Sequence, residues 1–150
     1  AIEVYKSTGK TISHLQKVSR LKPPEYNYII FGLTMDRGKL YDRINKRVDI
    51  MLENGLINEV KKLVELGYDK NAIAMQGLGY KEILAYLRGE CSLAEAVEIL
   101  KRETRRYAKR QITWFKRIEG VNWIDMDRFN NDTEILENIK DCLATSGIFL

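Results

Sequence analysis

The residues best suited to bind another molecule lie between positions 105 and 117. This stretch, RRYAKRQITWFKR, holds six Lys or Arg residues and no acid. The wider segment 101–118 carries eight Lys or Arg residues against Glu103 alone, whereas residues 119–150 carry seven acids and two bases. Such segregated charge indicates a polyanionic partner for one face of the protein.

A helical projection of this region separates the cations from the apolar side chains. The outer face carries Arg102, Arg105, Arg106, Lys109, Thr113, Lys116 and Arg117. The opposite side, which we expect to face the core, carries Leu100, Tyr107, Ala108, Trp114, Phe115 and Ile118. A solvated helix would normally interleave acids at i,i+4, and none follows Glu103. We therefore interpret the outer face as a phosphate-backbone binding surface, with a solvated charged face as the alternative.

Gln111 projects into the middle of the expected apolar face. An unpaired buried amide costs about 1–3 kcal/mol. We therefore expect the Gln111 side chain to have a specific hydrogen-bond partner inside the protein.

Arg47 is the second candidate for anion binding. It lies at the edge of an apolar stripe on a predicted helix, and no acid stands three or four residues away on that helix. The stripe consists of Leu40, Ile44, Val48 and Met51. A partly buried guanidinium needs a carboxylate from elsewhere or a bound phosphate, so a structural salt bridge and an anion site both remain open.

A glycine-containing loop, MQGLGY at residues 75–80, precedes another predicted helix. Backbone N–H groups at a helix start can approach an anion. A plain glycine turn is an equally good interpretation of this loop.

Other kinds of chemistry are disfavoured. GKT at residues 9–11 ends like a P-loop, but Val4 stands where that motif requires glycine and no strand precedes it. The only histidine is His14, and Cys91 and Cys142 are far apart, which disfavours a clustered metal site, a disulfide framework or a catalytic triad. Free cysteines favour a reducing, cytoplasmic location. No apolar run reaches the ~18 residues of a membrane span, so we expect no membrane partner.

The elements that must position these residues alternate between helix and strand. Strands are predicted at 28–35 and 121–127, the first of them buried on both faces. Asp36 is the expected N-cap of a helix to about Glu53, and Ser92 with Glu95 forms a capping box for the longest helix, 93–118. Further helices are predicted near the N-terminus and at 58–66, 80–87 and 133–143. The predicted class is α/β, predominantly helical, and two buried-type strands cannot make a covered parallel sheet alone.

Three segments in this order resemble the C-terminal half of the bacterial tRNA dimethylallyltransferase family: DRGKLYDRINKRVDIMLENGLINEV, QGLGYKEILAYLRGE and AKRQITWFKR. The resemblance runs from EVYKSTGK to WIDMD, nearly the whole chain. It implies transfer of a dimethylallyl group from its diphosphate to N6 of the adenosine 3′ of the tRNA anticodon. It also implies a single C-terminal fragment, 1–150, of a P-loop-type α/β enzyme. Residues 1–26 would end a helical insertion and linker, and 27–150 would form two late core strands with helical tRNA-binding elements.

The resemblance assigns roles at matching positions. Arg47 in RINKR matches a family arginine that contacts the diphosphate, and Arg43 is the second expected substrate contact. The implied tRNA-binding residues are Met75, Gln76, Tyr80, Arg102, Arg105, Arg106, Lys109, Arg110, Gln111, Trp114 and Lys116. Expected partners are the tRNA anticodon arm, dimethylallyl diphosphate and the P-loop half, which lies upstream in the family together with the catalytic aspartate. Mg²⁺ is an expected cofactor of the full-length enzyme, with none bound by this chain alone.

Two rival functions come from other classes. One is a stand-alone helical nucleic-acid-binding module without catalysis, and the other is a helical scaffold whose bases meet an acidic protein. Neither needs an internal anion site, so Arg47 is the residue that distinguishes them from a transferase.

Overall fold

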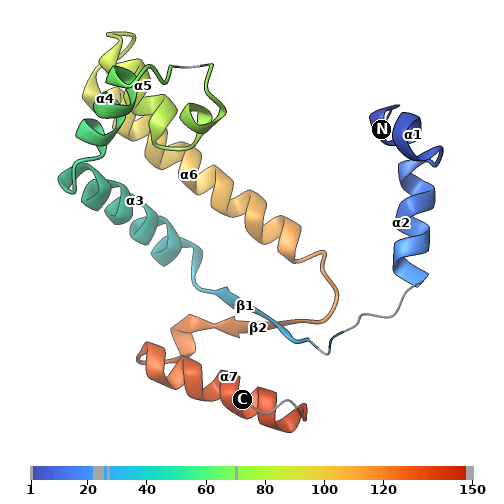
Figure 1. The fold of residues 1–150 in the computed structure, drawn as a ribbon. Helices are drawn as coiled ribbons and strands as arrows, with labels where there is room; N and C mark the ends of the chain where they lie inside the picture. Colours follow the sequence, from blue (N-terminus) through green and yellow to red (C-terminus); the bar gives the residue numbers. More distant parts are fainter. Residues whose placement is uncertain (1, 22–25, 27, 70, 148–150) are drawn as a thin grey trace.

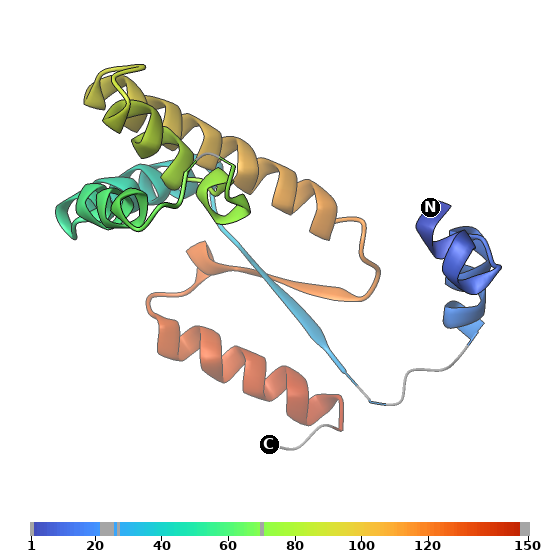
Figure 2. The same ribbon diagram turned by 45° about the horizontal axis from the view of Figure 1, so that its top comes forward.

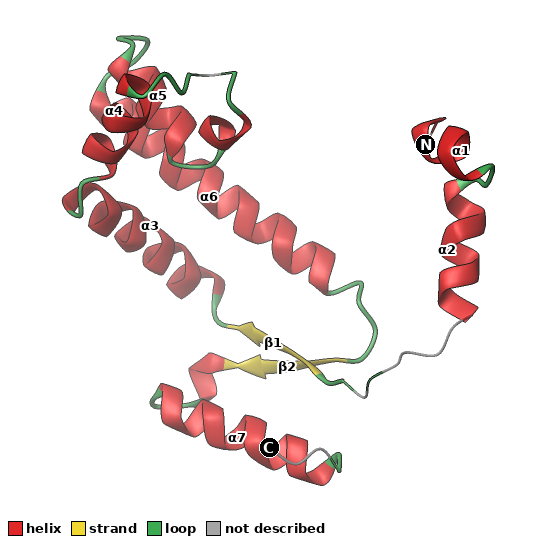
Figure 3. Ribbon diagram, in the orientation of Figure 1, coloured by secondary structure: helices red, strands yellow, loops and turns green. Residues whose placement is uncertain are grey.

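The computed structural model describes residues 2–21, 26, 28–69 and 71–147, and it is predominantly helical with one small parallel sheet (Figure 3). Helices α1 (Ile2–Thr8) and α2 (Ile12–Leu21) lie apart from the rest of the chain (Figure 1). The linker expected before residue 27 falls largely outside the described residues. The predicted α/β, mainly helical class is confirmed.

The sheet pairs β1 (Ile30–Thr34) with β2 (Val121–Asp125) in parallel, with Ile30 opposite Val121 and Thr34 opposite Asp125. Gly32 allows close packing across the pair, because a Cβ there would lie 2.8 Å from two ring atoms of Trp123. The prediction that the first strand is buried on both faces is wrong, since Leu33 is 53% exposed. In the described part of the chain β1 has only β2 beside it, so its other edge is unpaired and the sheet is too narrow to be fully covered.

Helix α3 (Arg37–Glu53) begins where the sequence predicts. The Asp36 side chain accepts hydrogen bonds from the backbone N–H groups of Gly38 (2.8 Å) and Lys39 (3.1 Å), which confirms it as the N-cap. Helix α4 (Leu56–Glu65) begins two residues earlier than predicted, because Gly55 adopts φ +93° and serves as its N-cap.

The main hydrophobic core lies at the end of the helices farthest from the sheet (Figure 1). It is built by α3, α4, the 3₁₀ turn η1 (Ile73–Gln76), α5 (Tyr80–Leu87) and the first half of α6 (Leu93–Phe115). Its buried members are Val48, Leu56, Val60, Met75, Ile83, Leu84 and Leu100. The Ser92–Glu95 capping box of α6 is confirmed, with Ser92 N donating to Glu95 Oε2 at 2.8 Å. The helix ends at Phe115, before the predicted Ile118, and residues 116–118 form a turn.

After β2 the chain forms the short 3₁₀ helix η2 (Met126–Arg128) and then α7 (Asp132–Thr145). The predicted strand therefore ends at Asp125, whose side chain accepts from Asp127 N (3.2 Å) and starts the turn. Figure 2 shows α7 on one side of the sheet and the α3–α6 helices on the other. Ile124 of β2 and Ile135 of α7 are both buried.

Candidate functional site

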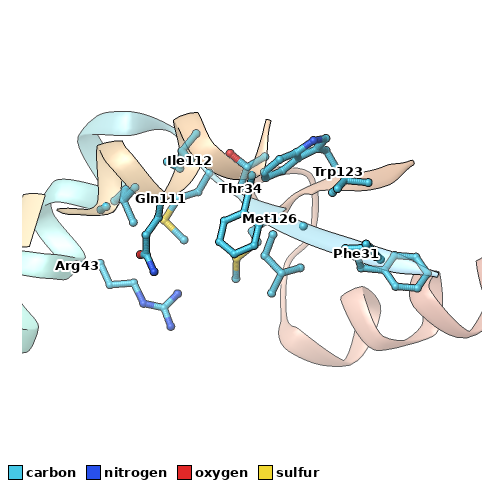
Figure 4. A pocket seen from close by; sticks show the side chains of 15 residues that line it. Phe31, Thr34, Arg43, Gln111, Ile112, Trp123 and Met126 are labelled. Carbon is cyan, nitrogen blue, oxygen red and sulfur yellow. The ribbon is translucent and has the colours of Figure 1, made fainter. Parts of the chain in front are cut away.

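An apolar pocket of about 420 Å³ opens between the two strands and helices α3 and α6. Its apolar wall includes Phe31, Leu40, Ile112, Phe115, Trp123 and Met126. Arg43 and Gln111 supply its main polar groups, and Figure 4 shows both side chains at the same end of the pocket. The arrangement suits a ligand with an apolar body and an anionic or hydrogen-bonding end.

Arg43 and Arg47 lie one turn apart on α3, and both are exposed. Arg43 lines the apolar pocket, whereas Arg47 lies beyond its lining. The expectation that Arg47 is partly buried is wrong: the helix turns Val48 into the core, and Arg47 next to it faces outward. Among the described residues neither arginine has an ion pair, so this part of the chain supplies no carboxylate for the salt-bridge alternative at Arg47.

The second half of α6 is more open than predicted. Tyr107 is 45% exposed, Trp114 60% and Phe115 41%, so these aromatics do not form a core face. The reason is that α6 packs on α3 and α5 through its first half, around Leu100, while its second half runs past the core toward the sheet.

Gln111 shares this exposure. Its amide makes no hydrogen bond to any residue in the described part of the chain, and the predicted internal partner is therefore wrong. Gln111 instead lines the apolar pocket, at the same end as Arg43 (Figure 4).

Replacing Gln111 with leucine is expected to leave stability within about 0.5 kcal/mol of the parent, as for other exposed positions that lack a specific contact. Urea melts of both proteins measure this difference. A loss of 1–3 kcal/mol, the range for a broken buried hydrogen bond, would contradict the exposed placement.

The outer side of α6 forms a second feature, which we call the basic hollow. Its lining consists of Arg106, Lys109, Arg110, Thr113, Trp114 and Arg117. Trp114 packs edge-on against Phe115, with ring centroids 4.9 Å apart. The Arg110 guanidinium lies over the Tyr107 ring at 5.8 Å. Cations and an exposed indole share this surface, a combination that suits a phosphate backbone with unstacked bases.

Unlike most cations of the basic hollow, the arginines near the middle of α6 have polar partners within the protein. Arg102 and Arg106 both contact Glu103 Oε1, at 3.3 and 2.7 Å. Arg105 is partly buried and donates to Asn45 Oδ1 on α3. Arg105 therefore connects α6 to α3. The predicted tRNA-binding cations that have no ion pair among the described residues are Lys109, Arg110 and Lys116.

Of the tRNA-binding residues predicted around MQGLGY, one is buried in the core and two reach the surface. Met75 is 1% exposed and belongs to the core, so its side chain is not available to a partner. Tyr80 is half-buried and donates its hydroxyl to Glu59, a hydrogen bond that raises the pKa of Tyr80. Gln76 is exposed. Gly79 is the N-cap of α5 with φ +100°, a conformation that disfavours any other residue there.

Sequence reasoning missed Asp127, which lies just after β2 at the carboxyl edge of the sheet. Its Oδ2 accepts from Asp36 N (2.6 Å) and its Oδ1 lies 2.7 Å from Lys39 Nζ. The hydrogen bond from Lys39 lowers the pKa of Asp127, and the same contact raises the pKa of Lys39. The available signal was the position of Asp36 and Asp127, each two residues after the end of a strand, because the carboxyl ends of parallel strands meet at one edge of the sheet.

The Asp127 contact predicts a pH dependence. Its folded-state pKa lies below the ordinary 3.8, so its stabilising effect is complete above pH 3.8 and disappears as the pH falls through the lowered value. The difference in unfolding free energy between the parent and Asp127→Asn is therefore expected to be largest near neutrality and to shrink below pH 3.8. Denaturant melts across pH 2–7 measure it. A difference that grows toward acid pH would contradict the assignment.

Within the described ranges no group of three or more His, Cys, Asp or Glu side chains could hold a metal ion. No helix in the same part of the chain is long and apolar enough to cross a membrane.

A family model described as IPP transferase matches residues 1–118. The chain belongs to the IPP transferase family. The predicted family resemblance is thus confirmed, and the match includes the pocket-lining arginine of α3 and the whole basic hollow.

Similar proteins within and beyond bacteria carry related names. The chain is 69% identical over 150 residues to the tRNA dimethylallyltransferase of Acetivibrio thermocellus, covering all of this chain and 48% of that protein. The crystal structure of the Staphylococcus epidermidis tRNA delta(2)-isopentenylpyrophosphate transferase superposes with TM-score 0.78 at 43% identity, over 97% of this chain and 47% of that one. A eukaryotic dimethylallyltransferase acting on tRNA superposes with TM-score 0.77 at 25% identity, over 99% and 40%. The chain spans about half the length of the curated IPP transferases it matches.

Proposed function

We propose that the protein transfers a dimethylallyl group from dimethylallyl diphosphate to N6 of the adenosine 3′ of the tRNA anticodon. The observation that carries the proposal is the 69% identity over the whole chain to a tRNA dimethylallyltransferase. In the transfer, a bond forms between N6 and the allylic carbon, the C–O bond to diphosphate breaks, and N6 loses a proton. The resemblance assigns the proton acceptor to an aspartate outside this chain. A cytoplasmic location is part of the proposal.

The tRNA-binding surface would be the basic hollow with its neighbours. Lys109, Arg110 and Lys116 are exposed cations without an ion pair among the described residues, which leaves them available for phosphates. Trp114 offers a ring for stacking, and Arg102, Arg106, Gln76, Tyr80 and Gln111 complete the proposed surface. We omit the buried Met75 and give Arg105 a supporting role, because it is bonded to Asn45.

The diphosphate would meet α3. Arg43 stands at the polar end of an apolar pocket, and Arg47 continues the same face of the helix one turn on. As the allylic C–O bond breaks, the departing diphosphate gains negative charge, so a fixed guanidinium stabilises the transition state more than the ground state.

Mg²⁺ is expected for the full-length enzyme, where it would neutralise diphosphate charge. The residues described here include no carboxylate-rich cluster that could hold it, so its ligands are not assigned to this chain.

The test is transfer of labelled dimethylallyl diphosphate to an anticodon stem-loop RNA by the protein at its natural length. A matched RNA with guanosine in place of the adenosine 3′ of the anticodon is the control. Label in the first RNA alone is the expected result. Tight RNA binding with no transfer to either RNA would favour the alternative, a nucleic-acid-binding module without catalysis.

A further inference from the structure

Three cations form a row on α3, because Lys39, Arg43 and Arg47 follow one another at intervals of four residues. The first member is held: Lys39 Nζ lies 2.7 Å from Asp127 Oδ1. The other two have no ion pair in the described part of the chain. One end of this α3 row is therefore fixed to η2, the turn that follows β2, and the cations proposed to meet the diphosphate lie further along α3.

A second contact strengthens this attachment. The other oxygen of Asp127 accepts from Asp36 N at 2.6 Å, and Asp36 in turn caps the first turn of α3 through Gly38 N and Lys39 N. Asp127 thus holds both the backbone that enters α3 and a side chain from its first turn. Its two oxygens bind separate groups, so the helix resists rotation about its own axis as well as translation from the sheet.

The attachment joins distant parts of the chain. Asp36 and Asp127 are 91 positions apart, and each stands two residues after the end of one of the paired strands. In parallel sheets the carboxyl ends of the strands form the edge where ligands bind. Asp127 is therefore placed to set the position of α3 at that edge.

We propose that Asp127 is a positioning residue for the transfer reaction: it fixes the rotation and position of α3 so that Arg43 and Arg47 face the diphosphate. This inference rests on the proposed function. A guanidinium moved by about 1 Å no longer matches the phosphate oxygens, and a misplacement of that size can cost up to about 100-fold in rate.

The test compares single-turnover transfer by the parent, Asp127→Ala and Asp127→Asn in the protein at its natural length. Asp127→Ala removes both contacts, and its rate is expected to fall by about 10-fold or more with tRNA affinity unchanged. Asparagine keeps an oxygen that can accept from Asp36 N but loses the ion pair, so its rate should lie between the two. Glu134→Gln is the matched control, because Glu134 also accepts a backbone hydrogen bond, from Asn130 N at 2.9 Å, but at the start of α7.

The possible outcomes distinguish a failure of the role given to Asp127 from a failure of the proposed transfer activity. Wild-type rates in both Asp127 variants, with lowered melting temperatures, would overturn the inference and leave Asp127 a stabilising residue only. An equal loss of rate in Glu134→Gln would also overturn it, by showing that general destabilisation is the cause. If Asp127→Ala does not fold, the Asp127→Asn rate decides alone. A parent protein that transfers nothing would instead overturn the proposed function, and this inference with it.

Discussion

Replacing Arg47 with alanine, in the protein at its natural length, is expected to slow single-turnover dimethylallyl transfer by about 10²-fold, the scale of losing one positioned charge donor. The structure leaves Arg47 exposed and without an ion pair among the described residues, so its charge is available to a ligand. Arg47→Lys should recover only part of the rate, because an ammonium cannot bridge two phosphate oxygens in the fixed geometry of a guanidinium. Affinity for tRNA should barely change.

The neighbouring Lys46→Ala is the matched control. It removes the same charge from an exposed site on the same helix, but it points about 100° away from Arg47 around the helix axis. An equal loss of rate in Arg47→Ala and Lys46→Ala would show that the loss comes from the lower net charge and not from the position of Arg47. Normal rates with weakened tRNA binding in Arg47→Ala would place Arg47 in the tRNA site.

Neutralising Lys109, Arg110 and Arg117 together is expected to weaken tRNA binding and to lower its salt dependence. Each phosphate contact adds about 0.7–0.9 to the slope of log K against log salt, so three lost contacts should reduce that slope by roughly 2–3. These cations line the basic hollow and have no ion pairs within the described residues, whereas Arg102 and Arg106 share Glu103 and Arg105 is bonded to Asn45.

The control for this experiment is the triple substitution of Lys46, Lys61 and Lys62 by alanine, which removes the same charge from exposed sites on α3 and α4. The measurement is binding of an anticodon stem-loop RNA over a range of salt concentrations. A slope that changes equally in both triple variants would contradict a localised binding surface and leave only a general effect of charge.

Local chemistry explains why the helix starts could be predicted. Asp36 and Ser92 cap α3 and α6 with atoms only two or three residues away, so their sequence signals suffice. The start of α4 was missed because the left-handed conformation of Gly55 allows a helix to begin directly after a helix end. The end of α6 depends on what the last turn packs against, which periodicity does not contain.

Burial could not be predicted in the same way. A helical projection gives the direction in which Gln111 or Trp114 points from the axis of α6. Whether the side chain is buried depends on which other elements pack on that side of the helix. Here the second half of α6 faces an open pocket and solvent. On α3, only Val48 of the expected apolar stripe is buried, and Arg47 beside it is exposed. The Asp127 contact was missed for a third reason: its partners lie about 90 positions away, so only the pairing of β1 with β2 brings them together.

Helix α6 is fixed to the helical core through its first half, and its second half carries the cations and Trp114 of the basic hollow. Lys101 to Asp49 (2.7 Å), Arg105 to Asn45 and the buried Leu100 secure its first half, while Trp114 stands fourteen residues beyond Leu100, about 21 Å along the axis. A rigid rod pivoting at such a mounting acts as a lever, and a tilt of about 5° carries Trp114 through roughly 2 Å. Small changes in the helical core are therefore magnified at the far end of α6, where the proposed tRNA-binding surface lies. Asn45 and Asp49 of α3, which hold Arg105 and Lys101, therefore help to set the position of the far end of α6.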